Sequence, residues 1–190
     1  MSYKSILVHT DQTTQCTERI HLAAALAMQE QAHLIGTAMT GISHVVFEVG
    51  AFDQHDPLFT QHVRVLRTYA DKSLEKFEQL TGSLDGLSTE SRLLDDDVVN
   101  GVSVQARYAD LVVLGQFDPD AAVPGVMPNF PESVLMNCVR PVLLLPTAWT
   151  FSALPVRALL AWDASMTATR AITGALPLLK RAGQVDQIGR

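Results

Sequence analysis

Polar residues that could contact a ligand follow two short apolar runs of the chain. His9 and Asp11 stand at the end of the first run, which begins at Ser5, and Gly115 directly follows the second run, Leu111–Leu114. A short, continuous apolar run is typical of a parallel strand that is covered on both faces. In an open sheet of parallel strands, ligands bind beyond the carboxyl ends of the strands. We therefore expect any ligand of this protein to bind near these residues.

Two of these residues also have a purely structural interpretation. Asp11 and the threonines that follow it are good N-caps for a helix that should begin near Thr14. We interpret His9 as a structural histidine of the strand end, with contact to a ligand as the alternative. Asp11 therefore remains open between capping and binding.

The sequence lacks the patterns that nucleophilic catalysis requires. Ser103 and Ser133 have no Gly-x-Ser-x-Gly context. The six histidines, at positions 9, 21, 33, 44, 55 and 62, show no paired ligand spacing such as His-x-x-x-His. We therefore predict that the protein is not an enzyme.

Two clusters of side chains raise the question of a metal site. Asp95, Asp96 and Asp97 precede a predicted helix over Val98–Arg107, where carboxylates interact favourably with the free N–H groups of the first turn. A divalent-metal site is the alternative for these three carboxylates. A second conceivable set comprises His44, Asp53, His55, Asp56 and His62. We interpret neither cluster as a metal site, and we predict no metal.

Composition narrows the class of protein. The chain has 190 residues, of which 47% are apolar, and a net charge of −6. Because nucleic-acid binding depends on clustered Lys and Arg, and no basic run is present, we expect no nucleic-acid partner. No apolar run approaches the length of a membrane span, and the first residues lead directly into a strand without a signal peptide. We therefore expect a soluble, cytoplasmic protein with no membrane partner.

The apolar patterns predict alternating strands and helices over the first 146 residues. Strands are predicted at 5–9, 33–40, 89–94, 111–114 and 142–145, and helices at 14–31, 58–81, 98–107 and 131–138. The mixed polarity of the third strand, 89–94, suggests an edge position. Residues 42–57 have no clear period and are predicted to form an irregular segment. Strands that alternate with helices imply a parallel sheet covered on both faces, which is an α/β fold.

The opening of the chain then recurs near its end. The segment Ser5–Asp11 aligns with Arg157–Asp163, an offset of 152 residues, and a helix from about Ser165 and a strand start at Val185–Ile188 follow. Pro177 inside this helix should kink it. The predicted organisation is a complete domain at 1–146, a linker at 147–155 and an incomplete second domain at 156–190. We expect this piece either to be poorly ordered or to use the surface of another unit. It could dock its helix on the first domain or pair Ala158–Trp162 with a strand edge, there or in a partner subunit.

Taken together, these motifs resemble the universal stress protein family in its tandem form. The resemblance rests on Ser-Ile-Leu-Val-His-Thr-Asp11, Ala-Arg-Tyr-Ala-Asp-Leu-Val-Val-Leu-Gly115, Pro-Glu-Ser-Val-Leu135, Arg-Pro-Val-Leu-Leu-Leu-Pro146, Leu-Leu-Ala-Trp-Asp163 and Ala-Leu-Pro-Leu-Leu179. It covers residues 3–146 as one domain and 156–188 as the opening of a second. It implies a Rossmann-like, five-stranded parallel sheet with strand order 3-2-1-4-5 between helices.

The resemblance also implies where a nucleotide would bind. Nucleotide-binding members carry Gly-x-x-Gly, nine residues, and then Gly-Ser or Gly-Thr after the fourth strand. With Gly115 in the first place, Asp118 takes the second and Pro128 with Asn129 takes the third. In binding members the position of Asp11 lies beside the adenine and ribose, and the backbone near Ala38 flanks the base.

At two of these positions the residue types oppose the binding of a polyphosphate. The carboxylate of Asp118 repels phosphate, and Pro128 lacks a donor N–H. We therefore predict a degenerate site that binds ATP weakly or not at all, with no cofactor. The alternative is a stress switch that binds ATP or another adenine nucleotide through Asp11, Ala38 and the 115–130 loop. A slow ATP hydrolase is a third hypothesis, and it would require the same binding.

The family resemblance also suggests how the protein acts. The last strand of the family fold, here Val142–Leu145, commonly mediates pairing between domains. We therefore expect a homodimer, formed through this strand or through the partial C-terminal repeat. The leading hypothesis is a stress-response protein that acts by association with itself or with partners.

Overall fold

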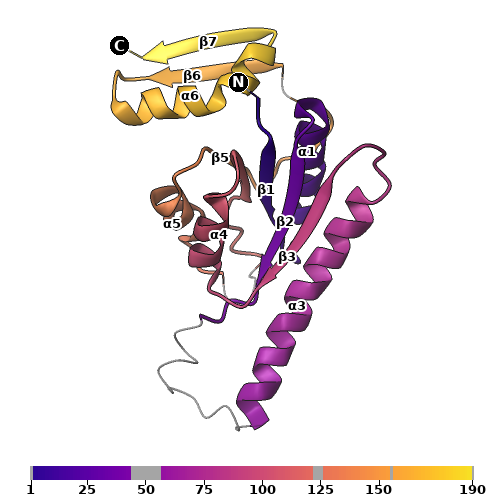
Figure 1. The fold of residues 1–190 in the computed structure, drawn as a ribbon. Helices are drawn as coiled ribbons and strands as arrows, with labels where there is room; N and C mark the ends of the chain where they lie inside the picture. Colours follow the sequence, from indigo (N-terminus) through magenta and orange to yellow (C-terminus); the bar gives the residue numbers. More distant parts are fainter. Residues whose placement is uncertain (1, 44–56, 122–125, 155, 190) are drawn as a thin grey trace.

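The computed structural model describes residues 2–43, 57–121, 126–154 and 156–189 (Figure 1). The elements of the first 146 residues are β1 (Ser5–His9), α1 (Gln15–Glu30), β2 (His33–Met39), α3 (Pro57–Thr81), β3 (Thr89–Leu94), α4 (Val98–Ala106), β4 (Leu111–Gly115), α5 (Phe130–Asn137) and β5 (Val142–Leu145). The predicted irregular segment 42–57 and the conceivable metal-ligand set of His44, Asp53, His55, Asp56 and His62 lie largely outside the described residues.

The first five strands form one sheet in the order β3-β2-β1-β4-β5, and every pairing is parallel. The predicted α/β fold and strand order are thus confirmed. The strand β3 lies at one edge, as its mixed polarity indicated, and β5 lies at the other. In Figure 1, α1 and α3 lie on one side of the sheet, and α4 and α5 on the other.

The buried core explains why the central strands are apolar without interruption. Ile6 and Val8 of β1 pack in the cluster that contains the α1 side chains and Phe77 of α3. Leu7, which points to the opposite face, packs with the α4 and α5 residues Val102 and Val134. Successive side chains of a strand face opposite sides. Since helices cover both sides of this sheet, the three central positions of β1, Ile6 to Val8, are all apolar.

The acidic run at 95–97 has three separate structural roles. The Asp97 carboxylate caps α4 by accepting a hydrogen bond of 2.9 Å from the Asn100 backbone N–H. Asp96 accepts a bond of 2.7 Å from the Asn100 side chain, and Asp95 forms an ion pair of 3.2 Å with Arg67. The capping interpretation is confirmed. Within the described ranges, no group of three or more His, Cys, Asp or Glu side chains could hold a metal ion.

The C-terminal residues form a second, smaller sheet. Strands β6 (Arg157–Trp162) and β7 (Gln184–Gly189) pair in parallel, joined by helix α6 (Met166–Arg181). Residues Ala158–Trp162 therefore pair with β7 rather than with an edge of the first sheet. The helix continues through Pro177 to Arg181. Among the described helices, none is long and apolar enough to cross a membrane.

Helix α6 packs on the first domain, which is one of the expected arrangements. The Tyr3 hydroxyl donates a hydrogen bond of 2.7 Å to the Gly174 carbonyl, and Arg181 Nε lies 3.0 Å from Glu30 Oε1. Gly174 lies against Pro141, where a side chain would collide with the proline ring. These contacts lie at the amino ends of the first strands. The carboxyl ends, where a ligand is expected, lie at the other end of the sheet (Figure 1).

Candidate functional site

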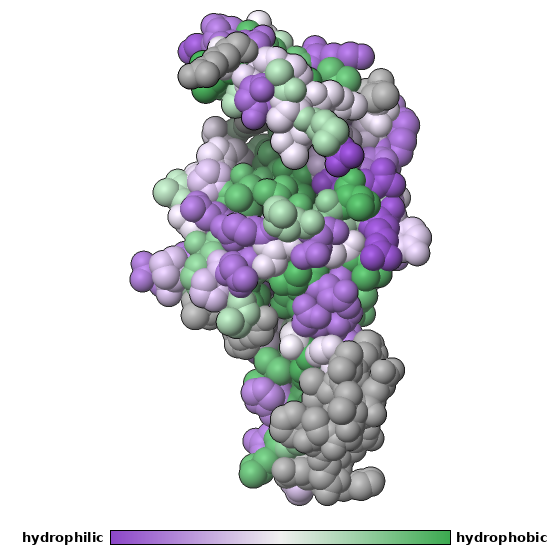
Figure 2. All heavy atoms as spheres, turned by 90° about the vertical axis from the view of Figure 1, so that its left-hand side faces the viewer, coloured by the Kyte–Doolittle hydropathy of each residue, from purple (hydrophilic) through white to green (hydrophobic). Residues whose placement is uncertain are grey.

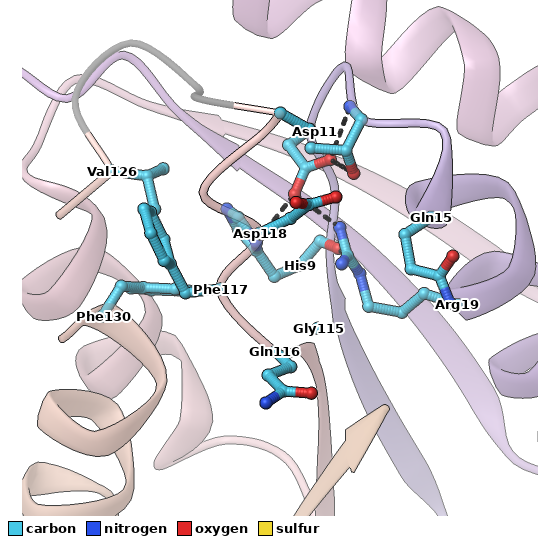
Figure 3. A pocket seen from close by; sticks show the side chains of 12 residues that line it. His9, Asp11, Gln15, Arg19, Gly115, Gln116, Phe117, Asp118, Val126 and Phe130 are labelled. Carbon is cyan, nitrogen blue, oxygen red and sulfur yellow. Dashed lines mark hydrogen bonds and ion pairs between the residues drawn. The ribbon is translucent and has the colours of Figure 1, made fainter. Parts of the chain in front are cut away.

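A cavity of about 30 Å³ lies at the carboxyl ends of β1 and β4. Figure 3 shows side chains from both strand ends and from α1 and α5 around it. Its lining residues are His9, Asp11, Thr13, Gln15, Arg19, Gly115, Gln116, Phe117, Asp118, Ala121, Val126 and Phe130. A cavity of this volume holds a few water molecules. The expectation that chemically active residues gather at this edge therefore corresponds to an observed hollow in the described part of the chain.

Asp11 is held by groups of the protein itself. Its Oδ1 atom accepts a hydrogen bond of 2.9 Å from the Thr13 N–H, and its Oδ2 atom accepts one of 2.7 Å from Arg19 Nη2. Burial alone would raise the pKa of this carboxyl, but the Arg19 guanidinium and the Thr13 bonds hold it well below its usual range. Asp11 is therefore a buried, ionised carboxylate at the strand end.

The predicted capping role of Asp11 is wrong in its detail. The N-cap residue of α1 is Thr14, which has a helical backbone and makes no side-chain capping bond. Asp11 precedes it by three residues and bonds within the turn to Thr13. The polar residues after β1 thus form a turn that is closed by Asp11, and the first turn of α1 lacks a side-chain cap.

Arg19 is the main residue of the site that sequence reasoning did not identify. It is 2% exposed, and its Nε donates a hydrogen bond of 2.7 Å to the His9 carbonyl. Its Nη1 atom lies over Gly115, so closely that a β-carbon at that position would collide with it. A signal was present in the sequence. Arg19 stands three residues after Cys16 and four before Ala23, so it lies on the apolar stripe of α1.

His9 is buried beside this pair. Its ring lies 5.0 Å from that of Phe130, measured between centroids, and its Nδ1 lies 3.8 Å from Asp11 Oδ2 without a hydrogen-bond partner in the described structure. Burial lowers the pKa of His9 to about 4, with Asp11 opposing the shift and Arg19 adding to it. His9 is therefore a neutral imidazole at neutral pH. The packing on Phe130 agrees with the structural interpretation of this residue.

The structure brings together three of the six candidate binding residues. Asp11, Gly115 and Asp118 line the cavity, and Asp118 Oδ1 accepts a bond of 3.0 Å from the Asp120 N–H. The described lining does not include the other three, Ala38, Pro128 and Asn129.

The remaining three candidates have other surroundings. Ala38 is buried beneath α3, against Ala70 and Leu74. Pro128 is exposed, and Asn129 is the N-cap residue of α5, without a side-chain capping bond. A nucleotide that contacted all six positions would therefore extend well beyond the cavity.

The start of α5 offers few free N–H groups to a phosphate. The Phe130 N–H donates to the Met127 carbonyl at 2.9 Å, and the Ser133 N–H donates to the Asn129 carbonyl at the same distance. Pro131, in the first turn, has no N–H. Anion binding at a helix start depends on such groups being free. This helix start is therefore poorly suited to bind phosphate.

No family model matches this chain, and no curated protein matches it. Solved structures do. A universal stress protein from Archaeoglobus fulgidus DSM 4304 is 15% identical with a TM-score of 0.66, and the match covers 98% of this chain and 67% of that one. The universal stress protein UspA from Lactobacillus plantarum is 16% identical with a TM-score of 0.59, covering 76% and 99%.

A third structure carries a bound nucleotide. The universal stress protein from Archaeoglobus fulgidus in complex with dAMP is 15% identical with a TM-score of 0.51, covering 76% of this chain and 98% of that one. At such identities the likeness concerns the backbone arrangement. With the parallel strand order 3-2-1-4-5 on the page, it leads to one statement: this chain has the fold of the universal stress proteins.

Proposed function

We propose that this chain is a universal stress protein that acts through association, without catalysis, and whose strand-end site does not bind ATP tightly. The fold supports membership in the family. The observation that carries the loss of ATP binding is the position of Asp118. Its side chain lines the cavity together with Asp11 and Gly115, and the resemblance to the nucleotide-binding members puts the phosphate groups of a nucleotide at this loop.

The charge of Asp118 is the main physical obstacle to a polyphosphate. Two like charges close together cost roughly 1–4 kcal/mol, depending on how far water screens them. The start of α5 cannot offset this repulsion, because the Phe130 N–H is already bonded and Pro131 has none. In the dAMP complex named above, a protein of the same fold binds a nucleotide. The competing function for this chain is therefore an adenine-nucleotide switch.

Isothermal titration with ATP and magnesium tests this proposal. The wild-type protein should show no binding in the low-micromolar range. Asp118→Gly, which restores the second glycine of the loop motif, should bind ATP more tightly than the wild type. The matched control is Asp120→Gly, which removes an equal charge at an exposed position outside the cavity lining. Low-micromolar binding by the wild type would establish the switch instead.

The proposed association concerns the edge strand β5 and its surroundings. Leu144 of β5 is 46% exposed, and the nearby α5 and the loop after it expose Leu135, Met136 and Val139 to a greater extent. Figure 2 shows apolar side chains gathered below the C-terminal unit, on the side of the molecule where α5 and β5 lie. An edge strand beside an apolar surface favours pairing with another chain. We propose that two copies of this chain pair there, with β6 and β7 as the alternative contact.

Sedimentation velocity at micromolar concentration tests the association. The wild type should sediment as a dimer, and Leu144→Lys on β5 should sediment as a monomer. Leu159→Lys, which places the same charge on the exposed face of β6, should leave the dimer intact. The reverse result for the two variants would assign the interface to the C-terminal unit. A monomeric wild type would refute the association.

A further inference from the structure

We infer that Arg19 determines the specificity of the strand-end site, because its guanidinium closes the site even to a nucleoside that carries no phosphate. The inference deepens the function proposed above and rests on it. In the proposed function, the loop after β4 disfavours the phosphate groups of a nucleotide. In the present inference, Arg19 of α1 excludes its base and ribose, so the two obstacles act on different parts of the ligand.

The guanidinium lies between the two strand ends that a ligand would have to contact. Nη2 donates to Asp11 Oδ2 at 2.7 Å, at the end of β1, and Nη1 lies over the backbone of Gly115, at the end of β4. Nε donates to the His9 carbonyl at 2.7 Å. The group is therefore hydrogen-bonded at the end of β1 and packs on Gly115 at the end of β4, so it occupies the space between the two strand ends (Figure 3).

Asp11 is consequently engaged within the protein. Its two oxygens already accept bonds from Arg19 and from the turn at Thr13. A ribose or adenine donor would have to compete with a charged, fully buried partner. Charge-assisted bonds of this kind are about twice as strong as those between neutral groups. A neutral nucleoside would therefore replace the bond between Asp11 and the guanidinium with a weaker one.

The same geometry gives Gly115 a role that requires no phosphate. A β-carbon at this position would meet Nη1 of Arg19. Glycine is therefore needed here to let the guanidinium lie on the strand end. The first glycine of the loop motif is explained by a neighbouring side chain of the protein itself.

The small volume of the cavity agrees with this role of Arg19. About 30 Å³ remains beside the guanidinium, which is the space of a few waters. His9 lines this cavity, but its Nδ1 is buried and lies 3.8 Å from Asp11 Oδ2. Removal of the guanidinium would join the remaining space to the volume that it now fills.

Adenosine tests the closure by Arg19 separately from the proposed repulsion of phosphate in the loop after β4, because it carries no phosphate for Asp118 to repel. The test variant is the double substitution Asp11→Asn with Arg19→Met, which removes both charges of the buried pair together and leaves no uncompensated ion. Isothermal titration should show adenosine binding at least about tenfold tighter than to the wild type, a difference of 1.4 kcal/mol. The matched control, Arg64→Met on the exposed side of α3, should bind adenosine as the wild type does.

Each outcome of the adenosine titration either supports or refutes the closure of the site by Arg19. If the wild type binds adenosine as tightly as the double variant, or the folded double variant gains less than this, Arg19 does not close the site and the inference is wrong. Circular dichroism establishes folding. Should the double variant fail to fold, Arg19→Lys takes its place, because lysine keeps the charge beside Asp11 but cannot also cover Gly115. Arg19→Lys must then bind adenosine more tightly than the wild type, and equal affinity overturns the inference.

The proposed function fails on a different measurement. It is refuted by low-micromolar binding of ATP to the wild type, whatever adenosine does. A wild type that binds adenosine but not ATP refutes the closure by Arg19 and leaves the loop argument standing.

Discussion

Helix α1 carries a carboxylate–arginine pair at each end, and the two pairs differ in what surrounds the cation. At its start, Asp11 pairs with Arg19 at 2.7 Å, and the side chains are 11% and 3% exposed. At its end, Glu30 pairs with Arg181 at 3.0 Å, and the side chains are 1% and 41% exposed. Glu30 is the more deeply buried carboxylate, yet its partner is the more exposed arginine.

The two pairs also differ in hydrogen bonding and in the sign of the helix field. Arg19 donates to both Asp11 and the His9 carbonyl, whereas Glu30 Oε1 is close to Arg181 but not aligned for a hydrogen bond. A carboxylate is favoured near a helix N-terminus and disfavoured near a C-terminus. The pair at the start of α1 therefore has both of its partners within the first domain. The pair at its end gains its partner only while α6 is docked.

The largest expected effect is the loss of the arginine from the first pair. Arg19→Met leaves Asp11 buried without its cation and should lower the free energy of unfolding by about 3–5 kcal/mol. Adding Asp11→Asn should recover most of this loss, because no buried charge then remains. Urea denaturation of both variants measures the difference. If Arg19→Met alone lowers the free energy of unfolding by less than about 1 kcal/mol, the pair contributes no more than an exposed ion pair does.

The pH dependence of stability gives the next largest effect. The pKa of His9 is lowered to about 4 in the folded protein, so the unfolded chain binds this proton first as the pH falls. The stability from neutral His9 is complete above about pH 6.5 and is lost as the pH falls towards 4, at most roughly 3 kcal/mol. His9→Phe should flatten this slope in urea titrations. An unchanged slope in His9→Phe contradicts the assignment.

Two glycine substitutions compare the packing near the two ends of α1. Gly115→Ala places a β-carbon against Arg19, and should lower the free energy of unfolding by about 1–3 kcal/mol through overpacking. Gly174→Ala places one 2.5 Å from Cγ of Pro141 and should loosen only the C-terminal unit. Limited trypsin digestion should then cleave faster after Arg170 and Lys180 while the first domain stays intact. Equal loss of global stability in both variants would mean that the two units unfold together.

The smallest effect is expected at the second pair. Glu30→Gln removes the charge next to a half-exposed Arg181, and should change the free energy of unfolding by no more than about 1 kcal/mol. Asp11→Asn, the equivalent change at the start of α1, should be clearly more damaging. Urea denaturation of the two variants side by side is the measurement. Equal losses would show that the surroundings of the cation do not distinguish the pairs.

The local patterns of the sequence were sufficient to predict the first sheet. Continuous apolar runs such as Leu111–Leu114 belong to strands that helices cover on both faces. Because each side chain of such a strand is buried, the pattern can be recognised in the sequence residue by residue. Thr89–Leu94 was predicted at an edge from its mixed polarity, and it lies there. Asp97 was predicted beside a helix start, and it caps that helix. All three features depend on neighbours within a few residues or on one buried face.

The site was predictable only in part. Asp11 and Gly115 follow parallel strands, so the topology alone brings them to one edge of the sheet. Ala38 also lies near a strand end, but it faces α3 and not the cavity. Arg19, the partner of Asp11, was missed because the stripe of α1 was read only for its apolar residues.

Composition and periodicity determined the class of fold and the end of the sheet where polar groups gather, and the resemblance to the universal stress proteins supplied the order of the strands. Tertiary structure decided which charge neutralises Asp11, what covers Gly115 and where α6 packs. The physical reason is distance along the chain. A strand or helix follows from interactions between near neighbours, whereas these contacts join side chains whose relative positions exist only once the packed elements fix the angle and depth of each helix.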